Sequence, residues 1–215
     1  MELTKAFADN VRTALFNGSL TEEQVAGMEV IFNAWSQPKY IGNDLRWLAY
    51  IFATAYWETA HTMQPVIETF NPAYDTANPS VETAIARLET SFSAGHLPWV
   101  QIPYWRKDVD GMSWLGRGYP QVTHKENYLK AEQRTGIKFT ADPALMLVPE
   151  NAVLVMFDGM INGWFSGKKL GDYFSTRVSD PVGARHIING TDHASDIANI
   201  YTQFFRALLQ GARVT

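Results

Sequence analysis

The sequence predicts an α+β fold that is mainly α-helical, with a small, irregular antiparallel β-sheet. Capped segments with helical periodicity occur in both halves of the chain, whereas residues 98–123 are rich in aromatic, glycine and proline residues. Helices and strands do not alternate, so a parallel βαβ sheet is not expected. For a chain of 215 residues we expect a single domain, residues 1–215, with two lobes around one cleft.

The helices are predicted from their apolar stripes and their caps. Thr21 and Gln24 form a capping box, and Ser80 and Gly95 start and stop a later helix. The stretch 47–57 has no charged residue, but it is shorter than the ~20 residues that span a bilayer, so a buried helix is expected. The expected helices cover residues 4–16, 21–36, 44–60, 80–94, 124–135, 149–163 and 192–210.

The other segments are predicted as loops and sheet. Residues 64–79 contain three prolines and several Asn and Asp residues, which indicates a long loop. Within residues 98–123, Asp110-Gly111 is a turn signal between aromatic segments, so we expect the small antiparallel sheet there. Pro181 suits the first turn of a helix.

Composition excludes several classes of protein. Hydrophobic residues make up 46% of the chain and charged residues 19%, as in an ordinary folded globule. There is no cysteine, which rules out disulfides, thiol nucleophiles and cysteine-bound zinc. The net charge of −4 argues against nucleic-acid binding. The N-terminal segment lacks a basic start followed by an apolar core, so we expect synthesis in the cytoplasm without a signal peptide.

The histidine and serine patterns indicate neither a metal site nor a serine nucleophile. The five histidines include no H-E-x-x-H or other close pair, and no G-x-S-x-G segment is present. We therefore expect no metal and no cofactor. We also expect no stable membrane insertion, and a monomer.

Glu58 is the first candidate for chemistry. It is in helical register with Ala55, Ile51 and Leu48, and therefore lies on the apolar stripe of the predicted helix. A carboxylate in that position should be partly desolvated, which favours the protonated form that a general acid needs. The alternative is that the helix simply ends there and Glu58 reaches water.

Glu68, ten positions later, is the candidate second carboxylate. It lies in the predicted loop 64–79, which could fold back over the end of the helix that carries Glu58. Two carboxylates across a cleft are the usual equipment for glycosidic cleavage, but a chain with 22 acidic residues contains many such pairs. Glu82 and Glu89 are the next candidates for the same role.

The segment G-R-G-Y-P-Q-V-T-H-K-E-N-Y, residues 116–128, is the second candidate. Gln121 and Thr123 alternate onto one face and Asn127 follows one helical turn later, so amides and a hydroxyl could line a groove. The alternative is a tight β-hairpin with hydrogen-bonded polar residues. Aromatic residues around the motif favour a carbohydrate ligand: Trp99, Tyr104, Trp105 and Trp114.

Together, two segments resemble a known family. W-E-T-A-H-T-M-Q-P-V-I-E, residues 57–68, resembles the catalytic segment of phage and prophage endolysins of the lysozyme-like superfamily, which are related to family 19 chitinases. Residues 116–128 resemble their second motif, Gly-Arg-Gly, two residues, Gln, one residue, Ser or Thr, and then Asn. The resemblance covers about residues 40–205 and implies a lysozyme-like fold.

The resemblance implies roles for individual residues. By position, Glu58 matches the general acid and Thr123 the residue that holds the attacking water. Gln121 and Asn127 match amides that bind sugar, and Glu68 is the expected second carboxylate. The remaining candidates for substrate binding lie in or beside the two motifs: Arg117, Tyr119 and His61.

Three positions depart from the family pattern. Trp57 stands where a histidine often precedes the acid, and His124 stands where an aromatic residue often follows the Ser or Thr. Pro120 replaces a residue that is usually aliphatic. Because proline cannot donate a hydrogen bond to a strand ladder, we expect an edge or a bulge at that position.

The implied activity is that of a muramidase, a glycoside hydrolase that cleaves the MurNAc–GlcNAc backbone of peptidoglycan and lyses bacteria. Such an enzyme would reach the periplasm or cell wall through a holin or a secretion machine, and no separate wall-binding module is expected. If the reaction is inverting, the two carboxyl groups should lie about 6.5–9.5 Å apart. A chitinase of family 19 type and a non-catalytic wall-sugar-binding protein are the alternatives.

Overall fold

The computed structural model describes residues 2–40, 42–69 and 78–211 of the chain. The chain forms two compact units: the helical unit, residues 1–64 with 153–215, and the small unit, residues 65–152. Helices make up 56% of the described residues, and the sheet found among them has two short antiparallel strands. The predicted α+β class with a small antiparallel sheet is therefore confirmed.

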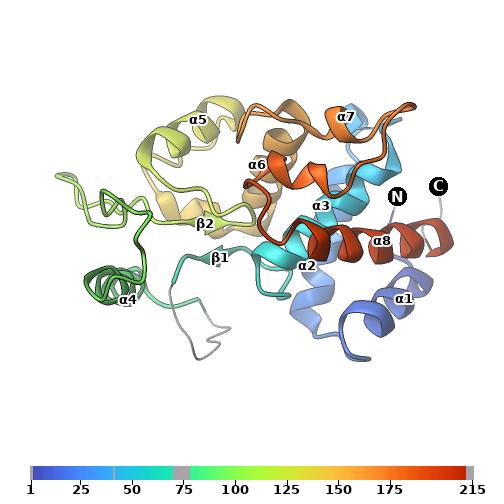
Figure 1. The fold of residues 1–215 in the computed structure, drawn as a ribbon, viewed down its shortest axis with the longest axis horizontal. Helices are drawn as coiled ribbons and strands as arrows, with labels where there is room; N and C mark the ends of the chain where they lie inside the picture. Colours follow the sequence, from blue (N-terminus) through green and yellow to red (C-terminus); the bar gives the residue numbers. More distant parts are fainter. Residues whose placement is uncertain (1, 41, 70–77, 212–215) are drawn as a thin grey trace. The chain divides into compact units, whose positions relative to one another are not determined.

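The predicted helices are all present, with ends within two residues of the expected ones. In chain order the α-helices are α1 (Lys5–Leu15), α2 (Glu22–Trp35), α3 (Leu45–Glu58), α4 (Val81–Ser93), α5 (Lys125–Thr135), α6 (Pro149–Asn162), α7 (Leu170–Tyr173) and α8 (Ala194–Gly211) (Figure 1). Short α7 and the 3₁₀ helices η1 (Pro38–Tyr40), η2 (Pro143–Leu147) and η3 (Gly183–Ile187) were not predicted. Pro181 precedes η3 instead of opening a helix. In the described part of the chain, no helix combines the length and apolarity needed to cross a membrane.

Side-chain caps define where the helices begin. The hydroxyl of Thr21 accepts from the N–H of Gln24 at 3.2 Å, and the Gln24 side chain accepts from the N–H of Thr21 at 2.9 Å, which is the predicted capping box. Ser80 caps α4 by accepting from the N–H of Thr83. Gly95, with a φ of +77°, follows the end of that helix.

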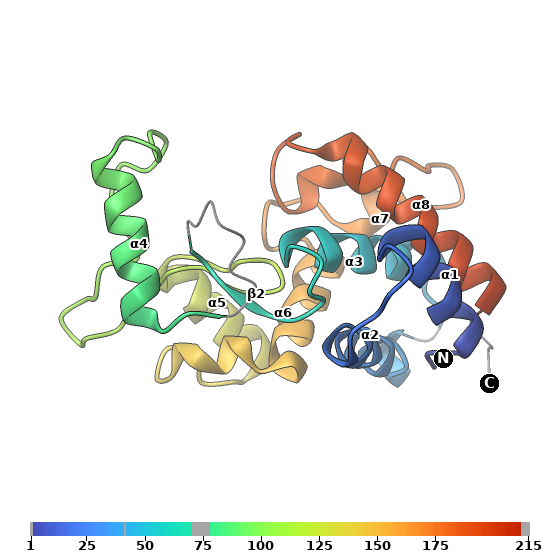
Figure 2. The ribbon, with the colours of Figure 1, turned by 90° about the horizontal axis from the view of Figure 1, so that it is seen from below.

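Helix α3 is the buried centre of the helical unit. It packs along α8, which also contacts α1 (Figures 1 and 2). Every residue from Leu48 to Tyr56 is buried, so this helix has no solvent face over that stretch. Phenylalanine rings from four helices meet around it: Phe7, Phe32, Phe52 and Phe204. The last turn of α3 is therefore held rigidly by packing on several sides.

The sheet lies in the small unit but only partly where it was expected. Strand β1 (Val66–Ile67) pairs antiparallel with β2 (Arg117–Gly118). The prediction placed the whole sheet within residues 98–123, and this is wrong for β1. The pattern missed β1 because two residues are too few to show the alternation of a strand.

An asparagine side chain completes the pairing of β1. Asn78 accepts a hydrogen bond from the N–H of Ile67 at 2.9 Å and donates one to the carbonyl of Pro65 at 3.0 Å. This side chain therefore replaces the backbone groups of a third strand. Residues 70–77 of the predicted 64–79 loop lie outside the described residues.

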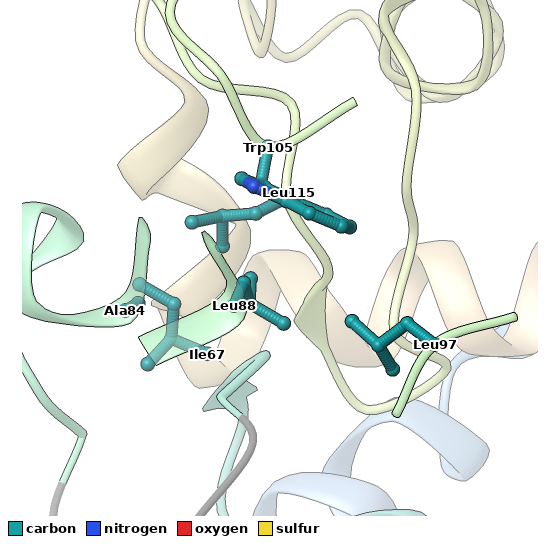
Figure 3. Close-up of a cluster of buried hydrophobic side chains, with 6 residues drawn as sticks. All are labelled: Ile67, Ala84, Leu88, Leu97, Trp105 and Leu115. Atoms are coloured by element: carbon teal, nitrogen blue, oxygen red, sulfur yellow. The ribbon is translucent and has the colours of Figure 1, made fainter. Parts of the chain in front are cut away.

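The small unit has a core of its own, which is shown in Figure 3. It is built by β1, by one face of α4 and by the segments that lead to residues 116–128, named the glycine motif. Its members are Ile67, Ala84, Leu88, Leu97, Trp105 and Leu115. Because this core joins β1 to the segment before β2, it fixes both segments that carry candidate site residues of this unit.

Candidate active site

Glu58 is the last residue of α3 and lies where the buried part of the helix ends. Its side chain is 16% exposed, and Leu48, Ile51 and Ala55 on the same face are fully buried. The helix stops at Thr59, whose hydroxyl donates to the carbonyl of Ala55 at 2.7 Å. The burial predicted for Glu58 is therefore observed.

The carboxylate of Glu58 has a buried cationic partner that the sequence did not indicate. Arg185, in η3, donates from Nη1 to Oε1 of Glu58, and its Nε donates to the carbonyl of Asp192 at 3.0 Å. Arg185 is 4% exposed. The guanidinium therefore gives the carboxylate a fixed partner of opposite charge and fixes the direction in which it points.

A neutral phenol lies near this ion pair. Tyr50 on α3 is fully buried, and in the described part of the chain its hydroxyl has no hydrogen-bond partner. Burial raises the pKa of Tyr50, the charge on Arg185 lowers it and the charge on Glu58 raises it, with burial the largest effect. Tyr50 therefore adds a buried hydroxyl, but no charge, to the surroundings of Glu58.

The turn after Glu58 holds three non-glycine residues in the left-handed region. Ala60, His61 and Met63 have φ values of 48°, 71° and 58°. The turn is packed against α2, because a Cβ atom on Gly27 would lie 1.8 Å from the carbonyl oxygen of Met63. Residues in such sparsely populated conformations cluster at functional sites, where the surrounding structure holds them in place.

Two histidines lie at the surface around this turn. His61 stacks on Tyr56, with ring centroids 4.1 Å apart, and partial burial lowers its pKa. His61 is therefore neutral at pH 7 and suited to a neutral ligand. His193, whose φ is +53°, contacts the ring of Trp57 with centroids 4.8 Å apart. Trp57, the residue just before Glu58, therefore contacts a histidine that directly precedes α8.

Glu68 directly follows β1 and is held by the glycine motif. Its backbone N–H donates to the carbonyl of Gly116 at 2.7 Å, and the N–H of Gly116 donates to Oε2 of Glu68 at 2.8 Å. The hydroxyl of Tyr104 donates to Oε1 at 2.6 Å. Both oxygens of this partly exposed carboxylate therefore accept hydrogen bonds from neutral donors in fixed positions.

The other two acidic candidates of the small unit form surface ion pairs. Glu82 accepts from Lys107 at 3.0 Å, and Glu89 accepts from Arg106 and from the indole of Trp105. The hydrogen bond from Lys107 lowers the pKa of Glu82, and the hydrogen bond from Arg106 lowers that of Glu89. Because these ion pairs occupy both residues, Glu68 is the better candidate for the second carboxylate.

The residues after β2 form a tight hairpin. The N–H of Arg117 donates to the carbonyl of Val122 at 3.2 Å, and the reverse bond measures 3.0 Å. Pro120 lies in the turn between them, where no ladder hydrogen bond is needed from it. Of the two interpretations of this motif, the hairpin is what the structure shows. This does not exclude a binding role for its exposed residues.

Two predicted substrate contacts are buried. Arg117 is 3% exposed and Tyr119 is fully buried. Arg117 donates to the carbonyl of Ser113 and to the hydroxyl of Tyr128, each at 3.0 Å. The expectation that Arg117 and Tyr119 contact substrate directly is therefore contradicted, because the hairpin turns both side chains inward. Arg117 instead joins the motif to α5.

The other three motif residues are partly or fully exposed. Gln121, with a φ of +52°, donates from its side chain to the carbonyl of Val66 at 2.8 Å and so ties the hairpin to β1. The side chain of Asn127 donates to the carbonyl of Thr123 at 2.8 Å. Among the described residues, no partner occupies the hydroxyl of Thr123, which is therefore available to hold a water molecule.

The candidate site thus has two parts, each built within one unit. Glu58 and Arg185 form the part in the helical unit, and Glu68 with Tyr104 forms the part in the small unit together with the hairpin. The sequence reasoning missed Arg185, which is 127 positions from Glu58, because no local pattern indicates such a pairing. It noted Tyr104 only as an aromatic residue, and the spacing of 36 positions to Glu68 carries no signal either.

Within residues 2–40, 42–69 and 78–211, no group of three or more His, Asp or Glu side chains could hold a metal ion. The residues described above offer acid, base and hydrogen-bond donor groups from side chains. Comparison with models of known protein families gives no match, and comparison with curated proteins gives none either. The assignment of function accordingly rests on the residues and contacts of this chain.

Proposed function

We propose that this protein is a peptidoglycan-cleaving glycoside hydrolase, a muramidase of endolysin type with a lysozyme-like fold. The observation that carries the proposal is the contrast between its two carboxylates. Glu58 is largely buried and paired with one cation, whereas Glu68 is partly exposed and accepts from two neutral donors. Acid/base cleavage of a glycosidic bond uses two carboxyl groups whose environments differ, one to donate a proton and one to accept it.

Glu58 is assigned the role of the general acid. Its carboxyl group lies at the end of a buried helix face, and in this role it protonates the glycosidic oxygen. Once the proton is transferred, Glu58 becomes an anion, and the guanidinium of Arg185 is in place to stabilise it. Arg185 is therefore a positioning residue that also favours the charged state formed during the reaction.

Glu68 is assigned the role of the general base, with Thr123 holding the water. The hydrogen bonds from Gly116 and Tyr104 fix the position of the Glu68 carboxylate, which in this role takes a proton from water. In this assignment the reaction inverts the anomeric configuration. Proton NMR of the first product formed from a soluble MurNAc–GlcNAc oligosaccharide reports the anomer directly. A retained configuration would make Glu68 a nucleophile and contradict its assignment as a base.

The decisive test is the variant Glu58→Gln assayed on purified sacculi. Loss of the general acid should lower the release of muropeptides by about 10²–10⁴-fold. Gln keeps an acceptor for Arg185, so the variant should remain folded by circular dichroism, with a stability loss of at most about 3 kcal/mol. Near-normal turnover by a folded Glu58→Gln protein would contradict the proposal.

Glu68→Gln and a matched control identify the second carboxylate. Glu68→Gln should lower the rate strongly, whereas Glu82→Gln, which removes a surface ion pair of the same unit, should leave it close to wild type. A strong loss in Glu82→Gln with none in Glu68→Gln would transfer the role of base to Glu82.

Product analysis separates the proposed activity from related ones. Mass spectrometry of digested sacculi should find reducing-end MurNAc, whereas reducing-end GlcNAc indicates a glucosaminidase and an anhydro end a transglycosylase. Chitin oligomers assayed in parallel test for chitinase activity. A protein that binds wall sugars without cleaving them, and whose affinity does not change in Glu58→Gln, would be a binding module. The proposed substrate lies outside the cytoplasm, so the proposal includes release by a holin or a secretion machine.

A further inference from the structure

One loop of the small unit, residues 98–104, crosses the surface between two buried anchors. Leu97 before it and Trp105 after it belong to the core in Figure 3 and are 7% and 0% exposed. A backbone turn closes the start of the loop, where the N–H of Val100 donates to the carbonyl of Leu97 at 3.1 Å. The position of the loop is therefore fixed by the core of the unit.

Two large apolar side chains of this anchored loop are exposed to solvent. Trp99 is 72% exposed and Ile102 is 78% exposed. By contrast, Trp105 and Trp114, the other tryptophans near the glycine motif, are 0% and 5% exposed. Exposed apolar groups that sit together contribute little to folding and are typical of binding surfaces. Of the three tryptophans expected near the motif to favour a sugar, only Trp99 is exposed to a ligand.

These side chains line a cavity of about 390 Å³, which is within the size range of small-molecule sites. Its walls are formed by Trp99, Val100, Gln101, Ile102, Tyr104 and His124. Tyr104 also donates its hydroxyl to Glu68, and its ring contacts that of His124 with centroids 4.5 Å apart. The cavity therefore shares Tyr104 with the surroundings of Glu68, and His124 in its lining directly follows Thr123.

The chemistry of the walls selects a neutral, amphipathic ligand. Among the described residues, no Lys, Arg, Asp or Glu belongs to the lining, so a phosphate or an acidic peptide would find no opposite charge there. The ring face of Trp99 suits the apolar face of a pyranose ring, as aromatic residues combine large contact area with low conformational entropy. Val100 and Ile102 can cover a methyl group, and Gln101 can hydrogen-bond an amide. These are the parts of an N-acetylated sugar.

We propose that this cavity, named the Trp99 pocket, is a binding site for one N-acetylhexosamine unit of the glycan strand. The unit stacks on Trp99, and its acetamido group lies between Ile102 and Gln101. Tyr104, shared with Glu68, places this unit next to the reacting part of the strand. The inference rests on the proposed function for the identity of the strand, but it concerns binding and can be tested without catalysis.

Isothermal titration of tetra-N-acetylchitotetraose measures this binding, with Glu58→Gln as the parent protein so that the sugar is not consumed. Trp99→Ala in that parent should weaken binding by roughly tenfold or more, as truncation of a central aromatic anchor does. Trp99→Tyr, which keeps a ring face, should recover most of the affinity. Leu129→Ala is the matched control, because Leu129 is an exposed apolar residue of the same unit outside the pocket lining, 45% exposed.

Three results would contradict the assignment of the Trp99 pocket as a sugar-binding site. The first is unchanged affinity in a folded Trp99→Ala protein, and the second is an equal loss in Leu129→Ala. The third is equal affinity of the parent for cellotetraose, which lacks acetamido groups. The outcome is distinguishable from failure of the proposed function, because loss of sugar binding in Trp99→Ala supports the pocket even if Glu58→Gln digests sacculi normally. Conversely, if Glu58 is essential for catalysis but Trp99→Ala does not change binding, the proposed hydrolase function is supported and the proposed sugar site is contradicted.

Discussion

The two units hold their candidate carboxylates in different ways. In the helical unit, Glu58 ends a helix that is buried all round, and a single buried arginine from 127 positions away holds it by charge. In the small unit, Glu68 follows a strand of two residues, and a peptide N–H and a tyrosine hydroxyl hold it through neutral hydrogen bonds. One carboxylate therefore depends on electrostatics inside a packed core, and the other on the geometry of a hairpin.

This difference determines what a mutation should do in each unit. Removing one partner from a buried ion pair leaves an uncompensated charge, so changes around Glu58 should affect stability and activity together. Removing one neutral donor from a partly exposed carboxylate leaves water as a substitute, so changes around Glu68 should affect activity more than stability. The following variants test this comparison, from the largest expected effect to the smallest.

Arg185→Met should have the largest effect. It leaves the carboxylate of Glu58 without its cationic partner, which typically costs about 3–5 kcal/mol when the pair is buried. Without the guanidinium the carboxylate of Glu58 loses the group that orients it, so the rate of sacculus digestion should fall as well. Urea denaturation and the rate of sacculus digestion measure the two effects.

Arg46→Met is the matched control for Arg185→Met. Arg46 forms an ion pair with Asp44 in the same unit and donates to the carbonyl of Ser175, so its loss should also lower stability. It should not lower the rate of sacculus digestion by the folded protein, because Arg46 does not contact Glu58. An equal loss of rate in both variants would mean that Arg185 acts only through stability.

Tyr104→Phe should lower activity with a small loss of stability. The variant removes one of the two neutral donors to Glu68, a hydrogen bond worth about 1 kcal/mol in stability. If Glu68 is the base, kcat/KM should fall by roughly tenfold, since each 1.36 kcal/mol is a factor of ten in rate. Tyr56→Phe is the control, because Tyr56 donates to the backbone carbonyl of Leu15 and to no carboxylate. Equal rates for wild type and Tyr104→Phe would argue against Glu68 as the base.

Gly116→Ala tests the geometry of the hairpin with a single methyl group. The added Cβ atom would lie 3.0 Å from Oε1 of Gln121 and 3.1 Å from Oε2 of Glu68, so both side chains would have to shift by tenths of an ångström. Activity should fall several-fold. The effect on stability should be smaller, because alanine reduces the entropy of the unfolded chain, and this stabilises the fold by about 0.4–1 kcal/mol and offsets part of the strain. Gly171→Ala, where the nearest atom is at 3.5 Å, should be tolerated. A fully active Gly116→Ala enzyme would contradict the assigned geometry.

Asp108→Asn should have the smallest effect, and only on stability. The hydrogen bond from the indole of Trp114, with further ones from Lys125 and the N–H of Met112, lowers the pKa of Asp108 to about 2 from 3.8. A depressed folded-state pKa stabilises the fold above the unfolded value, and this stability is lost as the pH falls from about 4 to about 2. The urea midpoint of Asp108→Asn should therefore lie below that of wild type at pH 7, and the two should converge near pH 2. A constant difference across this range would exclude the carboxylate as its cause.

Much of the fold could be predicted because its signals are local. The capping box of Thr21 and Gln24, the cap at Ser80 and the stop at Gly95 depend on residues within a few positions of one another. Strand β1 could not be predicted, since its pairing depends on a side chain eleven positions away and on a partner strand about fifty positions away. Short α7 and the 3₁₀ helices were missed because they are too short to show a period.

The candidate site was predictable to a similar degree. Glu58 could be placed on the buried face of its helix from periodicity, and the structure shows that burial. The same periodicity gives no information about Arg185. Arg117 and Tyr119 were expected to bind substrate because they lie in the second motif, but both are buried. A hairpin of this length does not follow the simple alternation of a strand, so the directions of its side chains depend on the turn.

The sequence by itself determined the helices, the absence of thiol chemistry and the two carboxylates worth testing, because each of these is a property of composition or of near neighbours. Only the tertiary structure decided what surrounds the carboxylates. It brought a buried arginine to Glu58, a peptide N–H and a phenol to Glu68, and an exposed tryptophan to the edge of a cavity that shares Tyr104 with Glu68. Contacts between residues far apart in the chain are set by packing of whole elements, and no local pattern records them.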